Sequence, residues 1–240
     1  MGGLPLDGQG GTHERFSARG GQERILGALI VANGELHDGP AVDELVRSRW
    51  DMVVCADGGT SHAAKLGIRP DVIIGDLDSM HGGALERFRS AGVEVLAYPR
   101  EKDKTDLDLA VEYVVAEGIS SIVALAAVGD RIDHVLANIL LTVKAASLGA
   151  SLVLTDGRSE VKLVMGEAEV VGAPGDWVSL VAIGGDARGV YTGGLKYPLC
   201  NADLRMGETL GVSNELLHGR GRVRVGSGHV VVIHTRRAGV

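Results

Sequence analysis

The chain has 240 residues, enough for one large or two modest domains. It is 45% hydrophobic and 23% charged, as is typical of soluble globular proteins, and its net charge of −7 argues against nucleic acid, whose phosphate backbone requires a basic surface. No apolar run is long enough to span a membrane and the N-terminus has no apolar signal core, so we expect a cytoplasmic protein without a membrane partner. The two cysteines, Cys55 and Cys200, form neither a disulfide framework nor a zinc-binding pattern.

The first half of the chain alternates between segments of strand and helix character. Residues 1–23 are rich in glycine and polar residues without periodicity, which predicts a disordered leader. From 24 to 150, the alternation predicts an α/β domain with a mostly parallel, Rossmann-like sheet and helices on both faces. The expected strands are 24–32, 51–56, 72–75, 94–97 and 122–128, and the expected helices are 41–50, 61–66, 84–91, 106–117 and 135–148.

The second half has a different pattern. Short strand-like runs follow one another between Gly and Asp turns, with almost no helical period. This predicts a small antiparallel β-sandwich or barrel, and we assign residues 151–240 to a sandwich domain, with the boundary near 149–158. The expected strands are 152–155, 161–165, 169–171, 177–183, 189–191, 223–225 and 229–235.

Polar motifs follow the carboxyl ends of the predicted parallel strands. Ligands of such sheets bind at these ends, so the motifs predict one wall of a converging site. Glycines in the turns would let backbone N–H groups approach a ligand closely. The motifs are Asn33-Gly34, Asp57-Gly58-Gly59, Gly75-Asp76-Leu77-Asp78-Ser79 and Gly129-Asp130-Arg131-Ile132-Asp133-His134.

Asp76 and Asp78 are the first candidates for a metal site. They lie two residues apart at a strand end, where both side chains can converge on one cation. Mg²⁺ in proteins takes one or two carboxylates together with substrate phosphates and water. The alternative is a solvated turn, in which Asp is common.

The run Glu101-Lys102-Asp103-Lys104-Thr105-Asp106 opens a predicted helix and offers a second charged group. Asp103 and Asp106 are further candidate metal ligands, and Lys102 or Lys104 can offer a point charge to a phosphate. The alternative is an ordinary charged helix start, favoured by the helix dipole, with Thr105 or Asp103 as the cap.

Three charged residues follow the strand predicted at 122–128. The guanidinium group of Arg131 can bind a phosphate through two hydrogen bonds, and Asp133 can accept the proton of an attacking hydroxyl or hold the water shell of a metal. We interpret His134 as an orienting group, because no second His or Cys lies at ligand spacing. The alternative is a helix start with a surface arginine. The chain contains neither GxxxxGK[ST] nor GxGxxG, which excludes P-loop chemistry and a dinucleotide fingerprint.

The second half offers candidate contacts to an organic ligand. Ser213 and Asn214 can hydrogen-bond an aminopyrimidine edge or an amide-like group, and Tyr197 can stack on a ring. The alternatives are a plain turn at 213–214 and an inter-strand loop around Tyr197 that packs on the core.

In this order, the motifs resemble the thiamine pyrophosphokinase family. The resemblance covers residues 25–235, because the second half also carries matching motifs, namely Ser179-Leu180-Val181, Gly194-Leu195-Lys196-Tyr197-Pro198-Leu199 and Val212-Ser213-Asn214. It implies an α/β catalytic domain, a thiamine-binding β-sandwich, and an ATP:thiamine diphosphotransferase that forms thiamine diphosphate and AMP with Mg²⁺ as cofactor. It also implies a homodimer, with thiamine held between the catalytic domain of one subunit and the sandwich of the other.

The resemblance also implies roles for individual residues. Mg²⁺ would be held by Asp76, Asp78 and Asp106, with Asp103 near it. The nucleotide and its phosphates would be bound by Asn33, Asp57, Gly58, Gly59, Lys104 and Arg131, and Asp133 would lie by the thiamine hydroxyl or the metal. Thiamine would be contacted by Ser213 and Asn214, with Tyr197 or an aliphatic wall against its ring, because no aromatic residue adjoins Ser213 in the sequence.

Two other functions fit the same motifs. One is a non-catalytic sensor of thiamine or nucleotide on the same fold, which would bind thiamine without releasing AMP. The other is a Mg²⁺-dependent phosphohydrolase, which would release phosphate without thiamine. The physical requirements of phosphoryl-type transfer favour the enzyme, since positioning and charge neutralisation suffice without a covalent nucleophile. The fixed positive charge of the thiazolium ring also suits an acidic protein.

Overall fold

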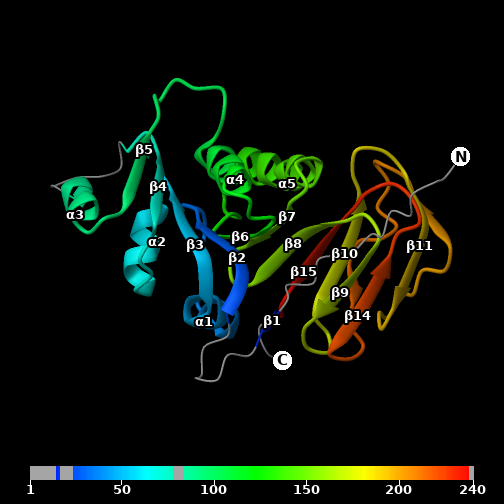
Figure 1. Ribbon diagram of the computed structural model, residues 1–240. Coiled ribbons are helices and arrows are strands. Elements are labelled where there is room, and N and C mark those ends of the chain that lie inside the picture. Colours follow the sequence, from blue (N-terminus) through cyan, green and yellow to red (C-terminus); the bar gives the residue numbers. More distant parts are fainter. Residues whose placement is uncertain (1–14, 17–23, 78–83, 238–240) are drawn as a thin grey trace, which may run out of the picture. The chain divides into compact units, whose positions relative to one another are not determined.

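The structure is a computed structural model that describes residues 15–16, 24–77 and 84–237 (Figure 1). The chain divides into two compact units between Lys162 and Leu163. This division lies after the boundary that we placed near 149–158, because the strand that follows residue 150 pairs with the sheet of the first unit. Within the described residues, no helix is both long and apolar enough to cross a membrane.

The first unit is built on a largely parallel sheet with the strand order β8-β7-β6-β2-β3-β4-β5, as predicted. Along this order, β8 at one end runs antiparallel to its neighbour β7. Within 1–23, the short β1 (Arg15–Phe16) pairs antiparallel with β2, and the rest lies outside the described residues. The strands are β2 (Arg24–Val31), β3 (Arg49–Ala56), β4 (Val72–Gly75), β5 (Glu94–Ala97), β6 (Ser121–Leu125), β7 (Ser151–Thr155) and β8 (Ser159–Val164).

In the part of the chain that the structure describes, five helices cover the two faces of this sheet. Val42 of α1 and Ala63 of α2 pack in one cluster with alternate strand residues such as Leu29 and Val31. The helices α4 and α5 contact each other and lie on the opposite face, where α4 contacts β2, β3 and β4 (Figure 1). Both faces are therefore apolar, which explains the continuous hydrophobic runs of the strands. The helices are α1 (Pro40–Arg47), α2 (Gly59–Leu66), α3 (Ala84–Ser90), α4 (Asp106–Ala116) and α5 (Ile132–Ser147).

Several predicted boundaries in the first unit differ from the structure by up to three residues; the helix expected at 135–148, for example, begins at Ile132. The helix expected at 41–50 ends at Arg47, because Trp50 already belongs to β3, where it pairs with Ile25. The strand expected at 122–128 ends at Leu125, because Ala126 adopts a φ of 56°, which turns the chain out of the extended conformation.

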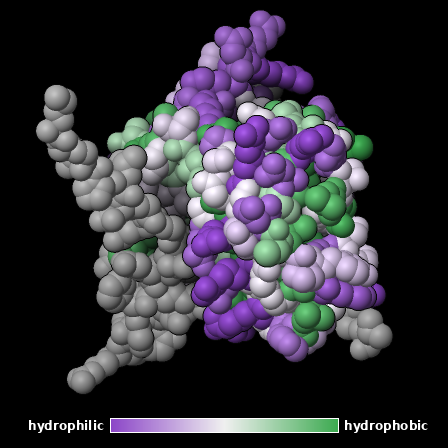
Figure 2. Space-filling model, turned by 90° about the vertical axis from the view of Figure 1, so that its right-hand side faces the viewer, coloured by the Kyte–Doolittle hydropathy of each residue, from purple (hydrophilic) through white to green (hydrophobic). Residues whose placement is uncertain are grey.

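The second unit contains two antiparallel sheets, with the orders β13-β10-β15 and β12-β11-β14-β9. Buried residues of both sheets, such as Val178, Val190, Val223 and Val232, form one core, which makes the unit the predicted sandwich. On the face in Figure 2, hydrophobic groups are small and separated by hydrophilic residues. The strands are β9 (Glu167–Val171), β10 (Trp177–Ala182), β11 (Ala187–Gly193), β12 (Ala202–Leu204), β13 (Asn214–Glu215), β14 (Arg220–Arg224) and β15 (Val230–Thr235). The prediction missed β12 and β13, which are too short to show a period.

Candidate functional site

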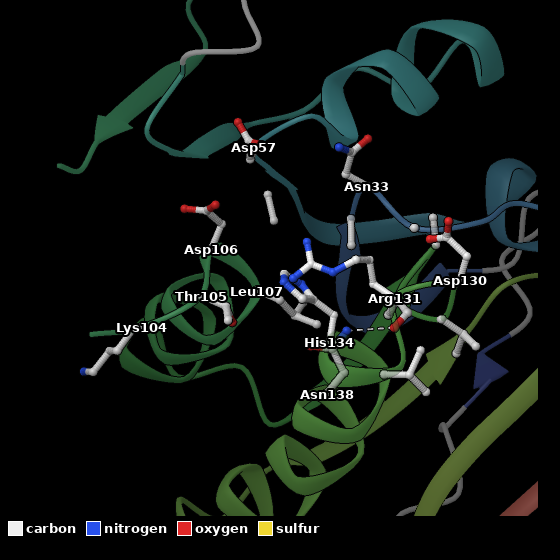
Figure 3. Close-up of a pocket in the computed structure, with 18 of the residues that line it drawn as sticks. Asn33, Asp57, Lys104, Thr105, Asp106, Leu107, Asp130, Arg131, His134 and Asn138 are labelled. Carbon is white, nitrogen blue, oxygen red and sulfur yellow. Dashed lines mark hydrogen bonds between the residues drawn. The ribbon is translucent and has the colours of Figure 1, made fainter. Parts of the chain in front are cut away.

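A cavity of about 410 Å³ opens in the first unit, where β2, β3, β4 and β6 end and α4 and α5 begin (Figure 3). Parallel strands bring their carboxyl ends to one edge, so motifs that are far apart in sequence meet here. Charged residues of both signs contribute to the wall. They are Asp57, Asp76, Arg100, Lys102, Lys104, Asp106, Asp130 and Arg131.

The backbone is strained where three of these strands end. Asp57, Leu77 and Ala126 follow β3, β4 and β6 with φ values of 44°, 62° and 56°. Residues other than glycine rarely adopt this left-handed conformation, and those that do cluster at functional sites. The strain lies in the loops that carry the cavity's carboxylates Asp57 and Asp76.

Asp106, the first residue of α4, and Lys102 form an ion pair in the cavity wall, and both side chains are largely enclosed. The Oδ1 atom of Asp106 lies 2.7 Å from Nζ of Lys102, and the two side chains are 23% and 14% exposed. Nevertheless this oxygen is buried without a hydrogen bond. The N-cap of α4 is Thr105, whose Oγ1 accepts a hydrogen bond from the backbone N–H of Asp108 at 3.2 Å. The cap fixes the helix start and therefore the position of Asp106.

Lys104 has a different partner, although it also lines the cavity. Its Nζ donates hydrogen bonds to both carboxylate oxygens of Glu112, at 2.9 and 2.7 Å. Lys144 of α5 lies 2.8 Å from Glu112 and also binds Asp108, so an ion-pair network ties α4 to α5. Hydrogen bonds from Lys104 and Lys144 lower the pKa of Glu112. In Figure 3 the ammonium group of Lys104 points away from Arg131 at the cavity centre.

Arg131 directs its guanidinium group into the middle of the cavity (Figure 3). Its Nε and Nη2 atoms donate hydrogen bonds to the two oxygens of Asp133, at 2.9 and 2.6 Å. These bonds lower the pKa of Asp133, so its carboxylate stays ionised over the physiological range. Asp133 is exposed and is not among the lining residues. In this structure it acts on the cavity through Arg131.

Hydrogen bonds hold the loops of the cavity in place. The backbone N–H of Gly34 donates to Ala126 O at 2.7 Å, and Nε2 of His62 donates to Gly34 O at 3.0 Å. On the opposite wall, Nδ2 of Asn138 donates to Ala127 O at 2.8 Å (Figure 3). The sequence prediction missed His62 as a loop-holding residue, because its partner lies on a different strand end.

The glycines Gly58 and Gly59 serve packing between strand ends. A Cβ atom on Gly58 would collide with the side chain of Asn33, and one on Gly59 would collide with the backbone oxygen of Val31. Neither glycine is among the lining residues, whereas Asn33, which rests on Gly58, is. Only glycine fits at these two close approaches.

In the second unit, Asn214 is buried and holds the loop of Tyr197. Its Oδ1 accepts from Tyr197 N at 3.0 Å, and its Nδ2 donates to Tyr197 O at 2.7 Å. Ser213 has a φ of 60°, is exposed, and donates its backbone N–H to Oγ of Ser179 at 3.1 Å. The side chain of Tyr197 is also exposed. The structure thus brings together the three predicted thiamine contacts and adds Ser179.

An aromatic residue does lie close to this group in the fold. Trp177 of β10 is paired with Glu215 of β13, two residues from Ser213, and it is 43% exposed. The guanidinium group of Arg237 lies 5.1 Å from the centre of its ring. This proximity could not be predicted from the sequence, because β10 and β13 are far apart in the chain.

Six predicted site residues line the cavity, and the others have different places. The lining residues are Asn33, Asp57, Asp76, Lys104, Asp106 and Arg131. Asp103 is exposed and not among them. Asp78 lies outside the described residues. Lys102, which the sequence offered as a phosphate contact, also lines the cavity, and so does Arg100, which the prediction missed. The run of charged residues just before α4 is the signal that could have found Arg100.

Family models match both units of the chain. Residues 44–154 match the catalytic domain of thiamin pyrophosphokinase, and residues 167–230 match its vitamin B1 binding domain. Thiamine pyrophosphokinase from Bacillus subtilis is 31% identical over 181 residues, which cover 75% of this chain and 85% of that protein. Thiamine pyrophosphokinase 2 from Arabidopsis thaliana is 27% identical over 211 residues, 78% of each chain.

Solved structures agree with the sequence comparison. The crystal structure of the Bacillus subtilis thiamine pyrophosphokinase superimposes with a TM-score of 0.77 at 27% identity, covering 88% of this chain and 99% of that one. That of the Geobacillus thermodenitrificans protein gives 0.72 at 26% identity, with 88% and 98% covered. Because the two family models together span more than half of the sequence, the chain belongs to the thiamine pyrophosphokinase family.

Proposed function

We propose that this protein transfers the diphosphoryl group of ATP to the hydroxyl group of thiamine, which yields thiamine diphosphate and AMP. The observation that carries the proposal is the cavity of the first unit, in a chain that matches both domains of the family. Carboxylates and cationic side chains line the same cavity, as a site for a metal-bound polyphosphate requires.

The cationic side chains would neutralise and orient the phosphates. Arg131 presents a planar guanidinium group at the cavity centre, held in place by two hydrogen bonds to Asp133. Arg100 lines the same wall. Phosphoryl-type transfer depends mainly on such positioning and charge stabilisation. Asp133 would therefore hold Arg131 in position. We propose as well that its carboxylate contacts the proton of the thiamine hydroxyl or a metal-bound water.

The residues present fit a Mg²⁺ ion. Asp106 has a buried oxygen without a hydrogen bond, and Asp76 lines the same cavity. Among the described residues, no three acidic, His or Cys side chains form a metal site by themselves. Mg²⁺ commonly takes few carboxylates and completes its coordination shell with phosphate and water, so a site with few carboxylates suits it. Asp76 and Asp106 would hold the ion, together with Asp78 and with Asp103 nearby, and the ion would neutralise charge on the transferred phosphates.

The second unit would supply the thiamine pocket. Exposed Ser213, the Tyr197 ring and one remaining N–H of the Asn214 amide are the proposed contacts. Asn214 also binds the Tyr197 backbone through two hydrogen bonds, so it would set the position of the aromatic ring. Thiamine is cationic, and an aromatic face attracts such a ring.

We propose further that the protein acts as a homodimer with a composite site. A support is the stripe of Ile132, Leu136 and Leu140 on α5, whose side chains are 82%, 57% and 49% exposed and follow each other at helical spacing. Mixing the inactive variant Asp106→Asn with Tyr197→Leu, at a thiamine concentration far below the KM of the Tyr197 variant, tests this. Subunit exchange should restore about a quarter of the activity if the two residues serve one site from different subunits, and none if each subunit is self-sufficient.

The function is tested by following nucleotides in a mixture of protein, Mg²⁺-ATP and thiamine. We expect AMP in amounts equal to thiamine diphosphate, and no AMP without thiamine. ADP as the sole product would contradict the proposal. Thiamine binding without AMP would indicate a sensor, and phosphate release without thiamine would indicate a phosphohydrolase.

A further inference from the structure

Two lysines flank the start of α4, and their surroundings separate their roles. The side chain of Lys102 is 14% exposed, and its Nζ lies 2.7 Å from Oδ1 of Asp106, inside the cavity wall. The side chain of Lys104 is 44% exposed and also lines the cavity, but its ammonium group is bound by Glu112. The residues alone left the two lysines interchangeable and the family resemblance implied Lys104 for the phosphates, but of the two only Lys102 touches a proposed metal ligand.

The ion pair between Lys102 and Asp106 lacks a hydrogen bond, so the Lys102 ammonium can change partners. Oδ1 of Asp106 accepts no hydrogen bond even though the ammonium nitrogen is 2.7 Å away, so the contact is a charge pair without hydrogen-bond geometry. By contrast, the Lys104–Glu112 pair has two hydrogen bonds and is shared with Lys144. Two directional hydrogen bonds fix the Lys104 ammonium in one geometry, so Lys104 is less able to change partners than Lys102.

We propose that Lys102 is the resident counter-ion of the site. It neutralises Asp106 while no metal is bound, and it moves its ammonium group to a phosphate oxygen of the nucleotide when Mg²⁺ binds Asp106. The inference rests on the proposed function, because it assigns the metal and the nucleotide to this cavity. Lys104 is then a structural residue that braces the loop before α4 against Glu112.

The proposal follows from the chemistry of the two groups. Two cations close to one carboxylate oxygen repel each other, so Mg²⁺ and the Lys102 ammonium compete for Asp106. A lysine has a flexible stem and three rotatable donors, which suit a group that changes partners. The exchange keeps the enclosed Asp106 charge compensated at every stage, which avoids the cost of an unpaired charge in the wall.

The test compares Lys102→Met with the matched control Lys104→Met in the full-length protein. Without nucleotide, a calorimetric or paramagnetic titration with Mn²⁺ should show about tenfold tighter binding to Lys102→Met than to wild type, because a charged competitor is gone. Affinity for Mg²⁺-ATP should fall by about tenfold in the same variant, since it has lost a charged donor to phosphate. Lys104→Met should change each value less than Lys102→Met does, because the ammonium group of Lys104 is held by Glu112.

A thermal-stability readout separates this role from a merely structural one. As a counter-ion, Lys102 leaves an uncompensated carboxylate when it is removed, so Mn²⁺ should raise the melting temperature of Lys102→Met more than that of wild type. If Lys102→Met does not fold, Lys102→Gln, which keeps a donor near Asp106, provides the same comparison. Unchanged Mn²⁺ affinity in the Lys102 variant, or a larger loss of nucleotide affinity in Lys104→Met, would overturn the proposal.

The outcome is independent of whether thiamine is the acceptor. The Mn²⁺ titration needs no turnover, so it reports on Lys102 even if the wild-type protein makes no AMP from thiamine. Conversely, normal AMP formation combined with unchanged metal affinity in Lys102→Met would reject the counter-ion and leave the proposed function intact.

Discussion

Each unit of the protein holds an aspartate beside a basic side chain, but the two carboxylates have different surroundings. In the first unit, Asp106 contacts Lys102 and keeps one buried oxygen without a hydrogen bond. In the second, Asp176 is 4% exposed and receives a hydrogen bond from Nε2 of His234 at 2.9 Å. It also accepts the backbone N–H groups of Ala173 at 2.9 Å and Arg237 at 3.0 Å.

The difference shows how a buried acid can be assigned a role. A carboxylate with all its hydrogen bonds made inside the protein, such as Asp176, has no capacity left for a ligand and stabilises the fold. A carboxylate with an orphaned oxygen at a cavity, such as Asp106, leaves a binding capacity that a ligand can fill. We therefore expect substitutions at the two positions to affect different observables.

The largest effect should come from Asp106→Asn. We expect the rate of AMP formation to fall at least about a hundredfold, because the variant loses a metal-holding charge in the cavity. The free energy of unfolding should fall by no more than about 1 kcal/mol, because the amide oxygen of the asparagine can still face the Lys102 ammonium. Steady-state kinetics and urea unfolding of the same preparation measure both. A loss of stability large enough to account for the loss of activity would mean that Asp106, like Asp176, is a structural residue.

Asp176→Asn should show the converse pattern. An amide in place of the carboxylate turns an N–H group toward the donors that surround it, and we expect the free energy of unfolding to fall by about 3 kcal/mol. The turnover of the molecules that remain folded should stay within about twofold of wild type. Urea unfolding, with the exposed Asp203→Asn as the control, measures this. A variant with normal stability and lost turnover would contradict the structural role.

The lowered pKa of Asp176 predicts that the protein loses stability in acid. Burial raises the pKa of Asp176, but the hydrogen bonds from Ala173, Arg237 and His234 outweigh burial and leave it lower than usual. A group with a lowered pKa in the folded state stabilises fully above the unfolded value, about 4, and loses its contribution as the pH falls through the folded value. The stability difference between wild type and Asp176→Asn should therefore shrink below about pH 4. A difference that does not vary with pH would mean that the carboxylate does not titrate with folding.

The contrast between the units also shows what could be predicted from the sequence. Asp76 was identified as a candidate because parallel strands end at one edge, a rule that needs only the strand pattern, and Asp106 because a charged run opens the predicted helix. The difference between Lys102 and Lys104 could not be predicted, because it depends on Glu112, which lies two turns along α4. Nothing in the local pattern of two lysines around one aspartate distinguishes a cavity partner from a surface one.

In the second unit, the limits arise from strand pairing. The position of Trp177 beside the turn at Ser213 follows from the register of β10 and β13, and β13 is only two residues long. A strand of that length has no period that a sequence can reveal. The role of Asn214 as the clamp of the Tyr197 loop was likewise hidden, since an Asn in a turn fits a ligand contact equally well.

A smaller effect should distinguish the two aromatic residues of the second unit. We expect Tyr197→Leu to raise the KM for thiamine about tenfold, because an exposed ring that can stack on the substrate is lost. Trp177→Leu should raise it only about twofold, because the indole ring is 43% exposed against 58% for Tyr197 and so offers less surface to the substrate. Thiamine titrations at saturating Mg²⁺-ATP measure both variants. The reverse order would assign the stacking position to Trp177.

The smallest effect should come from Thr105, which lines the cavity but whose hydroxyl is already used. Its Oγ1 accepts the N–H of Asp108, so by the criterion drawn from Asp176 it is a structural group despite its position. Thr105→Ala should lower the free energy of unfolding by about 1 kcal/mol through loss of the helix cap, and Thr105→Ser should retain most of it. Turnover should fall only modestly in the alanine variant, because a frayed α4 start loosens Asp106, and not at all in the serine variant. If Thr105→Ser keeps the stability of the wild type but not its turnover, the threonine methyl group contacts the substrate. A hydroxyl group whose hydrogen bond is made inside the protein would then not be enough to exclude a cavity residue from catalysis.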